Sequence, residues 1–358
     1  MLEEFYKNKK VLITGHTGFK GSWLNQILIN WGAQVIGYSL EPNTKPALFD
    51  ILGLSKCLEH HLGDIRDYQN LKKVIAQAKP EIVFHLAAQP LVRESYDDPL
   101  YTFQTNIMGT ANLLQAVEEN EGVKAVVIVT TDKVYRNQED GCCFKENDSL
   151  AGHDPYSASK AGAEIVVESY LKSFFNPQHY NVRHQTLIAS SRAGNVIGGG
   201  DRSKDRLMTD IIRAVFEYNT PISIRNPEAI RPWQHVLEPL FGYLLLAEKL
   251  YQGQGKFSGP WNFGPNEESF LTVEEILKKA ITIMKKGSYI IEKDDQKHEA
   301  TLLKLDIKKA KDILKWQPIF DIDKALNLTF NWYKSFYNKE NVIDLINQQM
   351  FSFFASLK

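Results

Sequence analysis

Short strand-like segments alternate with helix-like stretches through the first half of the chain. The segments with strand character are Lys10–Thr14, 35–38, 56–63, 80–87, 124–130 and 185–189. The stretches with helical spacing are 18–31, 67–78, 99–119 and 156–175. Consecutive apolar residues in strands that are separated by helices are typical of a parallel sheet buried on both faces. The pattern therefore predicts an α/β class protein with a doubly wound parallel sheet of the Rossmann type.

The composition of the sequence and the length of its strand-like segments change after about Arg192. Glycines cluster, arginines recur and the strand-like segments become short, which indicates a smaller C-terminal α/β lobe. An apolar run at 236–250 predicts a helix that returns to the first domain. The predicted organisation is a Rossmann domain at 1–190 with a returning segment near 229–262, a lobe mainly within 191–330, and a helical tail at 331–358. The tail either closes the lobe or contacts another subunit.

Composition and charge exclude several classes of partner. Forty-two basic and 43 acidic residues give a formal net charge of −1, which provides no broad basic field for nucleic acid or an anionic membrane. No stretch approaches the roughly 18 consecutive apolar residues of a membrane-spanning helix. Cys57, Cys142 and Cys143 match neither a disulfide framework nor a zinc site. Free thiols, no metal and a cytoplasmic location are expected.

A glycine-rich turn joins the first predicted strand to the first predicted helix. It reads Thr14-Gly15-His16-Thr17-Gly18-Phe19-Lys20-Gly21. Gly15 permits a tight turn, Gly18 lets the backbone approach a pyrophosphate, and Gly21 lets the helix pack close to the strand. The amide groups and the dipole at the start of the helix favour phosphates. The turn therefore predicts dinucleotide binding, and the residues between the glycines, Thr17 and Phe19, are counted in the site.

Two further strand ends extend this predicted cofactor site. Asp64 and Ile65 follow the third strand, where they either receive an adenine or form a solvated turn. The fourth strand ends in the small or apolar residues Leu86, Ala87 and Ala88, over which a dinucleotide can lie. The second strand ends without an early acidic residue and without an arginine for a 2′-phosphate, so NAD is favoured over NADP.

Two groups of polar residues suggest catalysis. Tyr156 and Lys160 lie four residues apart, hence on one helix face, where a cation lowers the pKa of a phenol. Thr131, Asp132 and Lys133 directly follow the strand at 124–130, at the sheet edge where ligands bind. Taken alone, the first group is more often a surface pair, and the alternative for the second group is a solvated turn. Together, and after the glycine turn, they predict an active site.

At this point the chain resembles the extended short-chain dehydrogenases that act on nucleotide sugars. Within that superfamily the 4,6-dehydratases carry Thr-Asp-Glu where this chain has Thr131, Asp132 and Lys133, and lysine in the third place is similar to the CDP-glucose branch. The stretches that carry the resemblance are GHTGFKGSW (15–23), GHDPYSASK (152–160), RAGNVIGGGD (192–201) and IRPWQHV (230–236).

The resemblance implies roles for the candidate residues. Tyr156 takes the proton of the sugar's 4-hydroxyl while NAD⁺ takes the C4 hydride, Thr131 orients that hydroxyl, and Lys160 lowers the pKa of Tyr156. Asp132 protonates the departing C6 hydroxyl. Lys133 either removes the C5 proton or stays charged and stabilises the enolate. The net reaction is then loss of water, with the cofactor restored.

The resemblance also implies where substrate and cofactor are held. Thr105 is assigned to the cofactor, and the smaller lobe to the substrate. Gln89, Asn195, Arg206 and Arg231 are assigned to the substrate, CDP-glucose, whose diphosphate requires cations. The dTDP-glucose enzymes place an arginine near residues 298–300, and its absence here fits a different nucleotide. A homo-oligomer, dimer or tetramer, is expected, and the product suits deoxysugars for surface polysaccharide such as lipopolysaccharide O-antigen.

Three other functions compete with this interpretation. A nucleotide-sugar 4-epimerase uses the same scaffold but needs no acid for a leaving C6 hydroxyl, so Asp132 and Lys133 argue against it. A 4,6-dehydratase for another nucleotide-hexose stays open, because the choice of base rests on the resemblance. A non-enzymatic dinucleotide sensor would need the glycine turn but not Tyr156 and Lys160.

Overall fold

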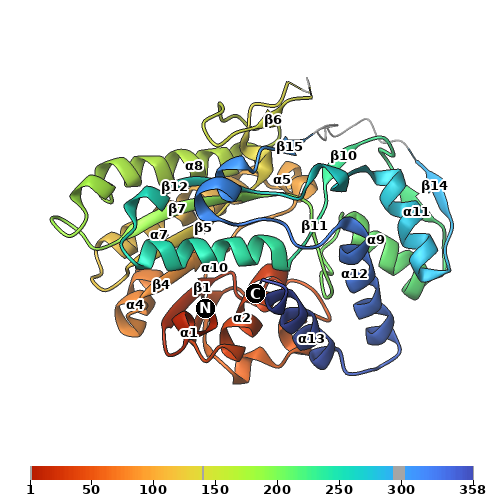
Figure 1. Ribbon diagram of the computed structural model, residues 1–358, viewed down its shortest axis with the longest axis horizontal. Helices are drawn as coiled ribbons and strands as arrows, with labels where there is room; N and C mark the ends of the chain where they lie inside the picture. Colours follow the sequence, from red (N-terminus) through yellow and green to blue (C-terminus); the bar gives the residue numbers. More distant parts are fainter. Residues whose placement is uncertain (1, 139–140, 293–302, 358) are drawn as a thin grey trace.

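The computed structural model describes residues 2–138, 141–292 and 303–357, and residues 298–300 therefore lie outside the described residues (Figure 1). Its centre is a seven-stranded sheet in the order β12-β7-β5-β4-β1-β2-β3, and each neighbouring pair is parallel. The strands are β1 (Lys10–Thr14), β2 (Gln34–Ser39), β3 (Glu59–Leu62), β4 (Ile82–His85), β5 (Ala125–Val129), β7 (Leu187–Ala193) and β12 (Gly259–Phe263). The predicted α/β class with a doubly wound Rossmann sheet is confirmed.

Successive residues of the strands enter two separate hydrophobic cores, one on each face of the sheet. On β1, Val11 and Ile13 belong to one core and Leu12 to the other. Helices α2 (Phe19–Asn30) and α10 (Leu237–Tyr251) are among those that contribute to the first core. Those that contribute to the second are α4 (Tyr68–Ala78), α7 (Gly109–Glu118) and α8 (Pro155–Ser173). Because both faces are buried, the central strands appear in the sequence as continuous apolar runs.

The helix predicted at 99–119 is present but is not uniform. It begins as α6 (Pro99–Phe103), passes through a π-helical turn η2 (Gln104–Met108) and continues as α7. π-Helical turns occur frequently at functional sites. The turn here carries Thr105, one of the residues assigned to the cofactor.

Two strands differ from the prediction. The strand predicted at 185–189 is β7, which runs on to Ala193 and so places Arg192 inside the sheet. The polar residues Ser190, Ser191 and Arg192 hide this continuation, although all three are buried, Ser190 and Arg192 through hydrogen bonds to Glu164. Strand β12 was not predicted within the returning segment. It begins with Gly259 and Pro260, which suit only an edge strand, and the edge is its position.

Much of the C-terminal half consists of short paired strands and helices (Figure 1). The pairs are β8 (Val196–Ile197) with β11 (Gln234–His235), β9 (Ile222–Ile224) with β14 (Tyr289–Ile291), β10 (Ile230–Pro232) with β13 (Phe270–Thr272), and β6 (Cys143–Phe144) with β15 (Lys304–Leu305). The helices are α9 (Leu207–Ile212), the π-helical η5 (Arg213–Tyr218), α11 (Val273–Met284) and the π-helical η8 (Ala310–Leu314).

The last two helices return to the Rossmann sheet. They are α12 (Ile322–Tyr337) and α13 (Val342–Ala355). The ring of Phe354 lies 4.7 Å from that of Trp31, and Asn347 Oδ1 accepts a hydrogen bond of 2.9 Å from Asn30 Nδ2. Helix α13 therefore packs beside the C-terminal end of α2, the end away from the glycine turn.

The remaining short elements connect these layers. They are α1 (Leu2–Tyr6), α3 (Leu48–Ile51), η1 (Leu54–Lys56), α5 (Val92–Asp97), η3 (Asp132–Val134), η4 (Pro177–His179), η6 (Gly255–Phe257) and η7 (Glu267–Ser269). Within the described ranges, no helix has both the length and the apolar character needed to cross a membrane.

Candidate functional site

A cleft of about 960 Å³ opens at the carboxyl ends of the parallel strands. It lies where the strand order reverses, between β1 and β4, which is the place where open parallel sheets bind ligands. The structure brings all of the predicted site residues to this one cleft. They are Gly15, Thr17, Gly18, Phe19, Gly21, Asp64, Ile65, Leu86, Ala87, Ala88, Gln89, Thr105, Thr131, Asp132, Lys133, Tyr156, Lys160, Asn195, Arg206 and Arg231.

The three glycines of the first turn lie in different environments. Gly15 has a φ of +74°, and a Cβ there would lie 2.6 Å from the backbone nitrogen of Ala87. A Cβ on Gly21 would overlap the carbonyl oxygen of Gly15, so the helix can pack this close only with glycine. At Gly18 a Cβ would meet only the Gly15 oxygen, at 3.4 Å, and the residue faces the cleft. Gly15 and Gly21 build the turn, and Gly18 leaves room for a ligand at the start of α2.

Side chains at the ends of β2 and β3 fix this part of the cleft. Thr17 Oγ1 lies 2.8 Å from Ser39 Oγ and donates to Leu40 O at 3.0 Å. The Asp64 carboxylate accepts from Arg66 Nε at 3.0 Å and from Arg66 Nη2 at 2.6 Å. Hydrogen bonding to Arg66 lowers the pKa of Asp64, so this carboxylate stays ionised at the rim of the cleft.

The residues after β5 form a tight polar turn. Thr131 caps η3, and its hydroxyl donates to Asp132 Oδ1 at 3.0 Å. Asp132 is only 1% exposed, and its second oxygen, Oδ2, has no hydrogen-bond partner among the described residues. A Cβ on Gly194 would overlap the Asp132 carboxylate, so the end of β7 packs directly against it. One carboxylate oxygen is therefore held by Thr131, and the other is buried and uncompensated.

Helix α8 places Tyr156 and Lys160 beside this turn. The helix begins with a capping box formed by Asp154 and Ser157, and its first turn is held further by a bond from Tyr156 N to Ser95 Oγ at 3.1 Å. Lys160 Nζ donates to Val129 O at 2.9 Å, at the end of β5. Lysine, tyrosine and the Thr131–Asp132 turn thus meet at the end of β5.

Burial dominates the electrostatics of the site. It raises the pKa of Tyr156 to about 12, while a hydrogen bond with Thr131 and the charge of Arg206 oppose the rise. Burial lowers the pKa of Lys160 to about 8, and the charge of Glu164 opposes the fall. The Tyr156 phenol is therefore protonated in the protein alone, and it needs added positive charge nearby to act as a base.

The residues assigned to the substrate are partly engaged by the protein. Arg206 Nη1 donates to Asp201 Oδ2 at 3.0 Å, and Arg231 Nη1 donates to Ile230 O at 3.0 Å. Asn195 adopts a φ of +42° in the loop between β7 and β8. The Gln89 amide nitrogen donates to Leu91 O and Thr102 Oγ1, at 3.1 and 2.9 Å. Gln89 therefore shapes the wall of the cleft, and its contact with a substrate stays a prediction.

Several cations that line the cleft were not predicted from the sequence. Lys20, within the glycine turn, lines the cleft, and burial with the charges of Arg206 and Lys160 lowers its pKa to about 7. Arg93 and Arg225 also line the cleft and form ion pairs with Asp205 at 3.9 and 3.5 Å. The position of Lys20 between two site glycines was a signal available in the sequence. Arg93 and Arg225 reach the cleft only through the tertiary fold.

Comparisons with known proteins give the family context. Residues 12–329 match the model of the family described as GDP-mannose 4,6 dehydratase. The chain is 48% identical to CDP-glucose 4,6-dehydratase of Salmonella typhimurium over 342 residues, 95% of each chain. It is 26% identical to UDP-glucose 4-epimerase of Mycoplasma pneumoniae, over 92% of this chain and 98% of that protein.

A solved structure agrees with the fold. The dTDP-glucose 4,6-dehydratase of Bacillus anthracis in complex with NAD is similar with a TM-score of 0.76. The likeness covers 94% of this chain and 99% of the other, at 21% sequence identity. At that identity it shows a shared fold.

Proposed function

Because the chain belongs to the GDP-mannose 4,6-dehydratase family, we propose that it is a nucleotide-sugar 4,6-dehydratase acting on CDP-glucose. The reaction converts CDP-D-glucose to CDP-4-dehydro-6-deoxy-D-glucose and water. The observation that carries the proposal is the meeting of Asp132 and Lys133 with Tyr156 and Lys160 in one cleft. Oxidation at C4 alone needs no acid for a leaving hydroxyl. The choice of CDP is supported by the 48% identity to the Salmonella enzyme.

The residues of the cleft fit NAD as the cofactor. Gly18 leaves open space at the start of α2, where backbone amides favour a pyrophosphate. The residues that line the cleft at the end of β2 are Ser39, Leu40, Glu41 and Asn43, and none of them is basic, which favours NAD over NADP. When bound, NAD serves as the reversible redox partner that oxidises C4 and later reduces C6. Residues 1–190 with the returning segment near 229–262 would hold it, and the lobe within 191–330 would hold the nucleotide sugar.

Tyr156 is proposed to take the proton of the 4-hydroxyl, and Thr131 to orient that hydroxyl. The pKa of about 12 shows how much this step depends on nearby positive charge. Arg206 already lowers the pKa of the phenol, and the charges of Lys160 and of an oxidised nicotinamide act in the same direction. The product keeps the ketone at C4, so the cycle closes when Tyr156 loses this proton, through solvent, and Asp132 regains the one that it gave to the departing water.

Asp132 is proposed to give its proton to the departing C6 hydroxyl. Thr131 holds Oδ1, whereas the buried Oδ2 has no partner among the described residues. Oδ2, which no described residue engages, is the oxygen proposed to donate to the leaving hydroxyl. The C5 proton would pass to Lys133, or Lys133 would stay charged and stabilise the enolate while water or another group takes the proton.

Two substitutions at Lys133 separate these two roles. Lys133→Met removes both the base and the charge, whereas Lys133→Arg keeps the charge but is far too weakly acidic to act as a neutral base. We expect Lys133→Met to abolish exchange of the C5 hydrogen with solvent in a 4-keto nucleotide sugar. If Lys133→Arg restores exchange, Lys133 is the electrostatic stabiliser. If both variants lose exchange, it is the base, and unchanged exchange in Lys133→Met excludes both roles.

Mass analysis after incubation with CDP-glucose and NAD tests the overall reaction. Loss of one water from the nucleotide sugar is expected. A product of unchanged mass but altered configuration would instead indicate a 4-epimerase, and no change would leave a dinucleotide sensor. Parallel incubations with dTDP-, GDP- and UDP-glucose test the nucleotide. A cytoplasmic location and a homo-oligomeric state, dimer or tetramer, belong to the same proposal and are checked by cell fractionation and light scattering.

A further inference from the structure

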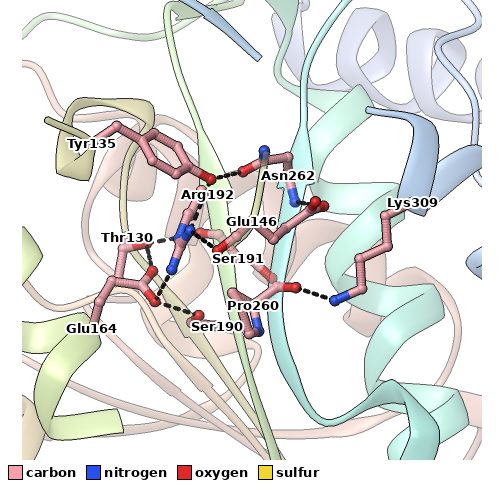
Figure 2. A network of polar contacts seen from close by, with 10 residues as sticks. All are labelled: Thr130, Tyr135, Glu146, Glu164, Ser190, Ser191, Arg192, Pro260, Asn262 and Lys309. Atoms are coloured by element: carbon pink, nitrogen blue, oxygen red, sulfur yellow. Dashed lines mark hydrogen bonds and ion pairs between the residues drawn. The ribbon is translucent and has the colours of Figure 1, made fainter. Parts of the chain in front are cut away.

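We call residues 131–134, which include Thr131, Asp132 and Lys133, the catalytic turn. A buried polar network includes Thr130 and Tyr135, the residues on either side of this turn (Figure 2). Its centre is the ion pair between Glu164 on α8 and Arg192 on β7, with 2.9 Å between Arg192 Nη2 and Glu164 Oε2. Both side chains are only 3% exposed. Burying two charges this deeply costs more than a surface pair returns, unless the remaining donors and acceptors are satisfied.

The hydrogen bonds of the carboxylate are satisfied from two strands. Glu164 Oε1 accepts from the hydroxyl of Thr130, and Glu164 Oε2 accepts from Ser190 Oγ at 2.7 Å in addition to Arg192. Thr130 directly follows β5, and Ser190 lies on β7. Glu164 therefore ties helix α8 to the ends of the two strands next to the catalytic residues.

The guanidinium of Arg192 contacts Tyr135, at the C-terminal side of the catalytic turn. Its Nη1 donates to Tyr135 OH at 2.8 Å and to Glu146 O at 2.9 Å, and its central carbon lies 4.9 Å from the Tyr135 ring centre. Tyr135 OH in turn donates to Asn262 Oδ1 at 2.6 Å. Figure 2 shows the tyrosine, the arginine and the asparagine in one continuous chain of contacts.

Thr130 and Tyr135 are the residues on either side of Thr131, Asp132, Lys133 and Val134. Each is held by one member of the ion pair, Thr130 by Glu164 and Tyr135 by Arg192. Two residues beyond Arg192, Gly194 packs against the carboxylate of Asp132. Strand β7 therefore anchors the end of the catalytic turn through Arg192, and the residue just after the strand, Gly194, packs against Asp132.

Glu164 also lies one helical turn from Lys160 on α8, and its charge supports the protonated form of that lysine. The other charged or titratable groups around the pair come from several elements. They are Tyr156 on α8, Asp132 and Tyr135 near η3, Lys20 on α2, His85 on β4, Glu146, and Lys309 just before η8. Glu164 is the group whose charge raises the pKa of Lys160 against the effect of burial.

We propose that the Glu164–Arg192 pair is a positioning unit, which clamps both ends of the catalytic turn and holds the Glu164 carboxylate one helical turn from Lys160. Neither residue lines the cleft, so neither touches the substrate. Glu164 acts through Thr130 and Lys160, and Arg192 acts through Tyr135. The kinetic part of this inference rests on the proposed dehydration, whereas the charge of Lys160 can be measured without any reaction.

Two substitutions at Glu164 separate clamping from charge. Glu164→Gln keeps the shape and removes the charge, and Glu164→Asp keeps the charge but is too short to reach Thr130 as before. The matched control is Glu217→Gln, because Glu217 also pairs with a buried arginine, Arg202, but lies outside the cleft. Circular dichroism establishes that each variant is folded.

The first measurement is the titration of Lys160, followed by NMR of ¹³Cε-labelled lysine and assigned with Lys160→Met. In the wild type the midpoint is expected near the pKa of about 8, and Glu164→Gln should lower it by about one unit, as loss of a nearby opposite charge does. Glu164→Asp and Glu217→Gln should leave it in place. An unchanged midpoint in Glu164→Gln overturns the role of the charge, whatever reaction the protein catalyses.

The second measurement is the pH profile of kcat for CDP-glucose. Glu164→Gln should move the fall of kcat at high pH to lower pH, by about the shift of the Lys160 midpoint. Glu164→Asp should lower kcat about tenfold or more, but its KM and the pH at which kcat falls should not change. A purely structural pair would lower the amount of folded protein and leave both this pH and kcat per folded molecule unchanged. If Glu164→Gln does not fold, wild-type kcat in Glu164→Asp alone overturns the clamp. If the wild type does not dehydrate CDP-glucose, the proposed function fails while the lysine titration still decides this inference.

Discussion

At the scale of single residues, the two oxygens of Asp132 lie in different environments. Oδ1 accepts a hydrogen bond from Thr131, while Oδ2 is buried against Gly194 without a partner among the described residues. This asymmetry supports the proposed role of Asp132 as the general acid.

Replacing Asp132 by asparagine tests that role. The asparagine side chain would be isosteric and would still accept from Thr131, but its amide cannot give a proton to a leaving hydroxyl. We expect Asp132→Asn to fold normally and to lose about 10²–10⁴-fold in kcat for water loss, the usual contribution of a general acid. Exchange of the C5 hydrogen with solvent should continue, because it precedes departure of the C6 hydroxyl. Wild-type kcat in this variant would show that another group supplies the proton.

The individual site residues were predictable to the extent that short motifs carry them. The glycine turn, the Thr131–Lys133 triplet and the Tyr156–Lys160 pair are each local in sequence, and all lie in the cleft. Glu164 and Arg192 could not be found in this way. Arg192 opens the RAGNVIGGGD stretch and Glu164 lies in the predicted helix at 156–175, but neither motif shows that the two pair, because the contact forms only where α8 packs against β7.

At the scale of elements, a single carboxylate links helix α10 to the segment before α12. Glu238 accepts hydrogen bonds from the backbone nitrogens of Ile319, at 3.0 and 3.1 Å, and of Phe320, at 2.6 Å. Glu238 is 1% exposed, and burial raises its pKa from 4.5 to about 8 against the effect of these bonds. The folded protein therefore holds a proton on Glu238 that the unfolded chain releases.

The contribution of Glu238 to the free energy of unfolding therefore falls as pH rises from its pKa in the unfolded chain, 4.5, to its pKa in the folded protein, about 8. Above about pH 4.5 the unfolded carboxyl is ionised while the folded one stays protonated until about pH 8, so this group favours unfolding progressively across that window. Glu238→Gln does not titrate. Its free energy of unfolding should improve relative to wild type as pH rises from about 5 to about 8, by at most about 1.4 kcal/mol per pH unit. Urea unfolding at several pH values measures the difference.

Glu275→Gln is the control for this pH effect. Glu275 caps α11 through Thr272, and hydrogen bonding to Thr272 lowers the pKa of its carboxyl. Both its folded and unfolded forms are ionised above about pH 5, so its difference from wild type should not change across the window. A pH-independent difference in Glu238→Gln as well would mean that Glu238 is ionised in the folded protein.

Elements were predictable where burial on both sheet faces forced an apolar run. Strands β1, β4 and β5 satisfy that condition, and they were placed correctly to within a few residues. The end of β7 and the whole of β12 are not apolar runs. The end of β7 carries buried polar residues, and β12 is an edge strand that begins with Gly259 and Pro260. The pattern cannot show such strands, because their neighbours come from distant parts of the chain.

At the scale of the whole molecule, the cofactor site draws on elements that lie far apart in the sequence, so binding should stabilise the fold as a unit. A ligand at 100 times its Kd adds about 2.7 kcal/mol to the free energy of unfolding. We expect saturating NAD to raise Tm by several degrees, and NADP by much less, because the lining residues at the end of β2 are not basic. Thermal unfolding followed by intrinsic fluorescence measures both shifts. An equal shift with NADP would contradict the assignment of NAD.

Gly18→Val shows whether that shift comes from the glycine turn. Gly18 has a φ of −76°, and a Cβ there meets only one atom, at 3.4 Å, so valine should be accepted without backbone strain. The added methyl groups would nevertheless occupy the space at the start of α2 that a pyrophosphate needs. Gly18→Val should therefore unfold within a few degrees of the wild type and lose the increase in Tm with NAD. If the increase persists, the dinucleotide does not lie across this turn, and the proposed position of NAD in the cleft is wrong.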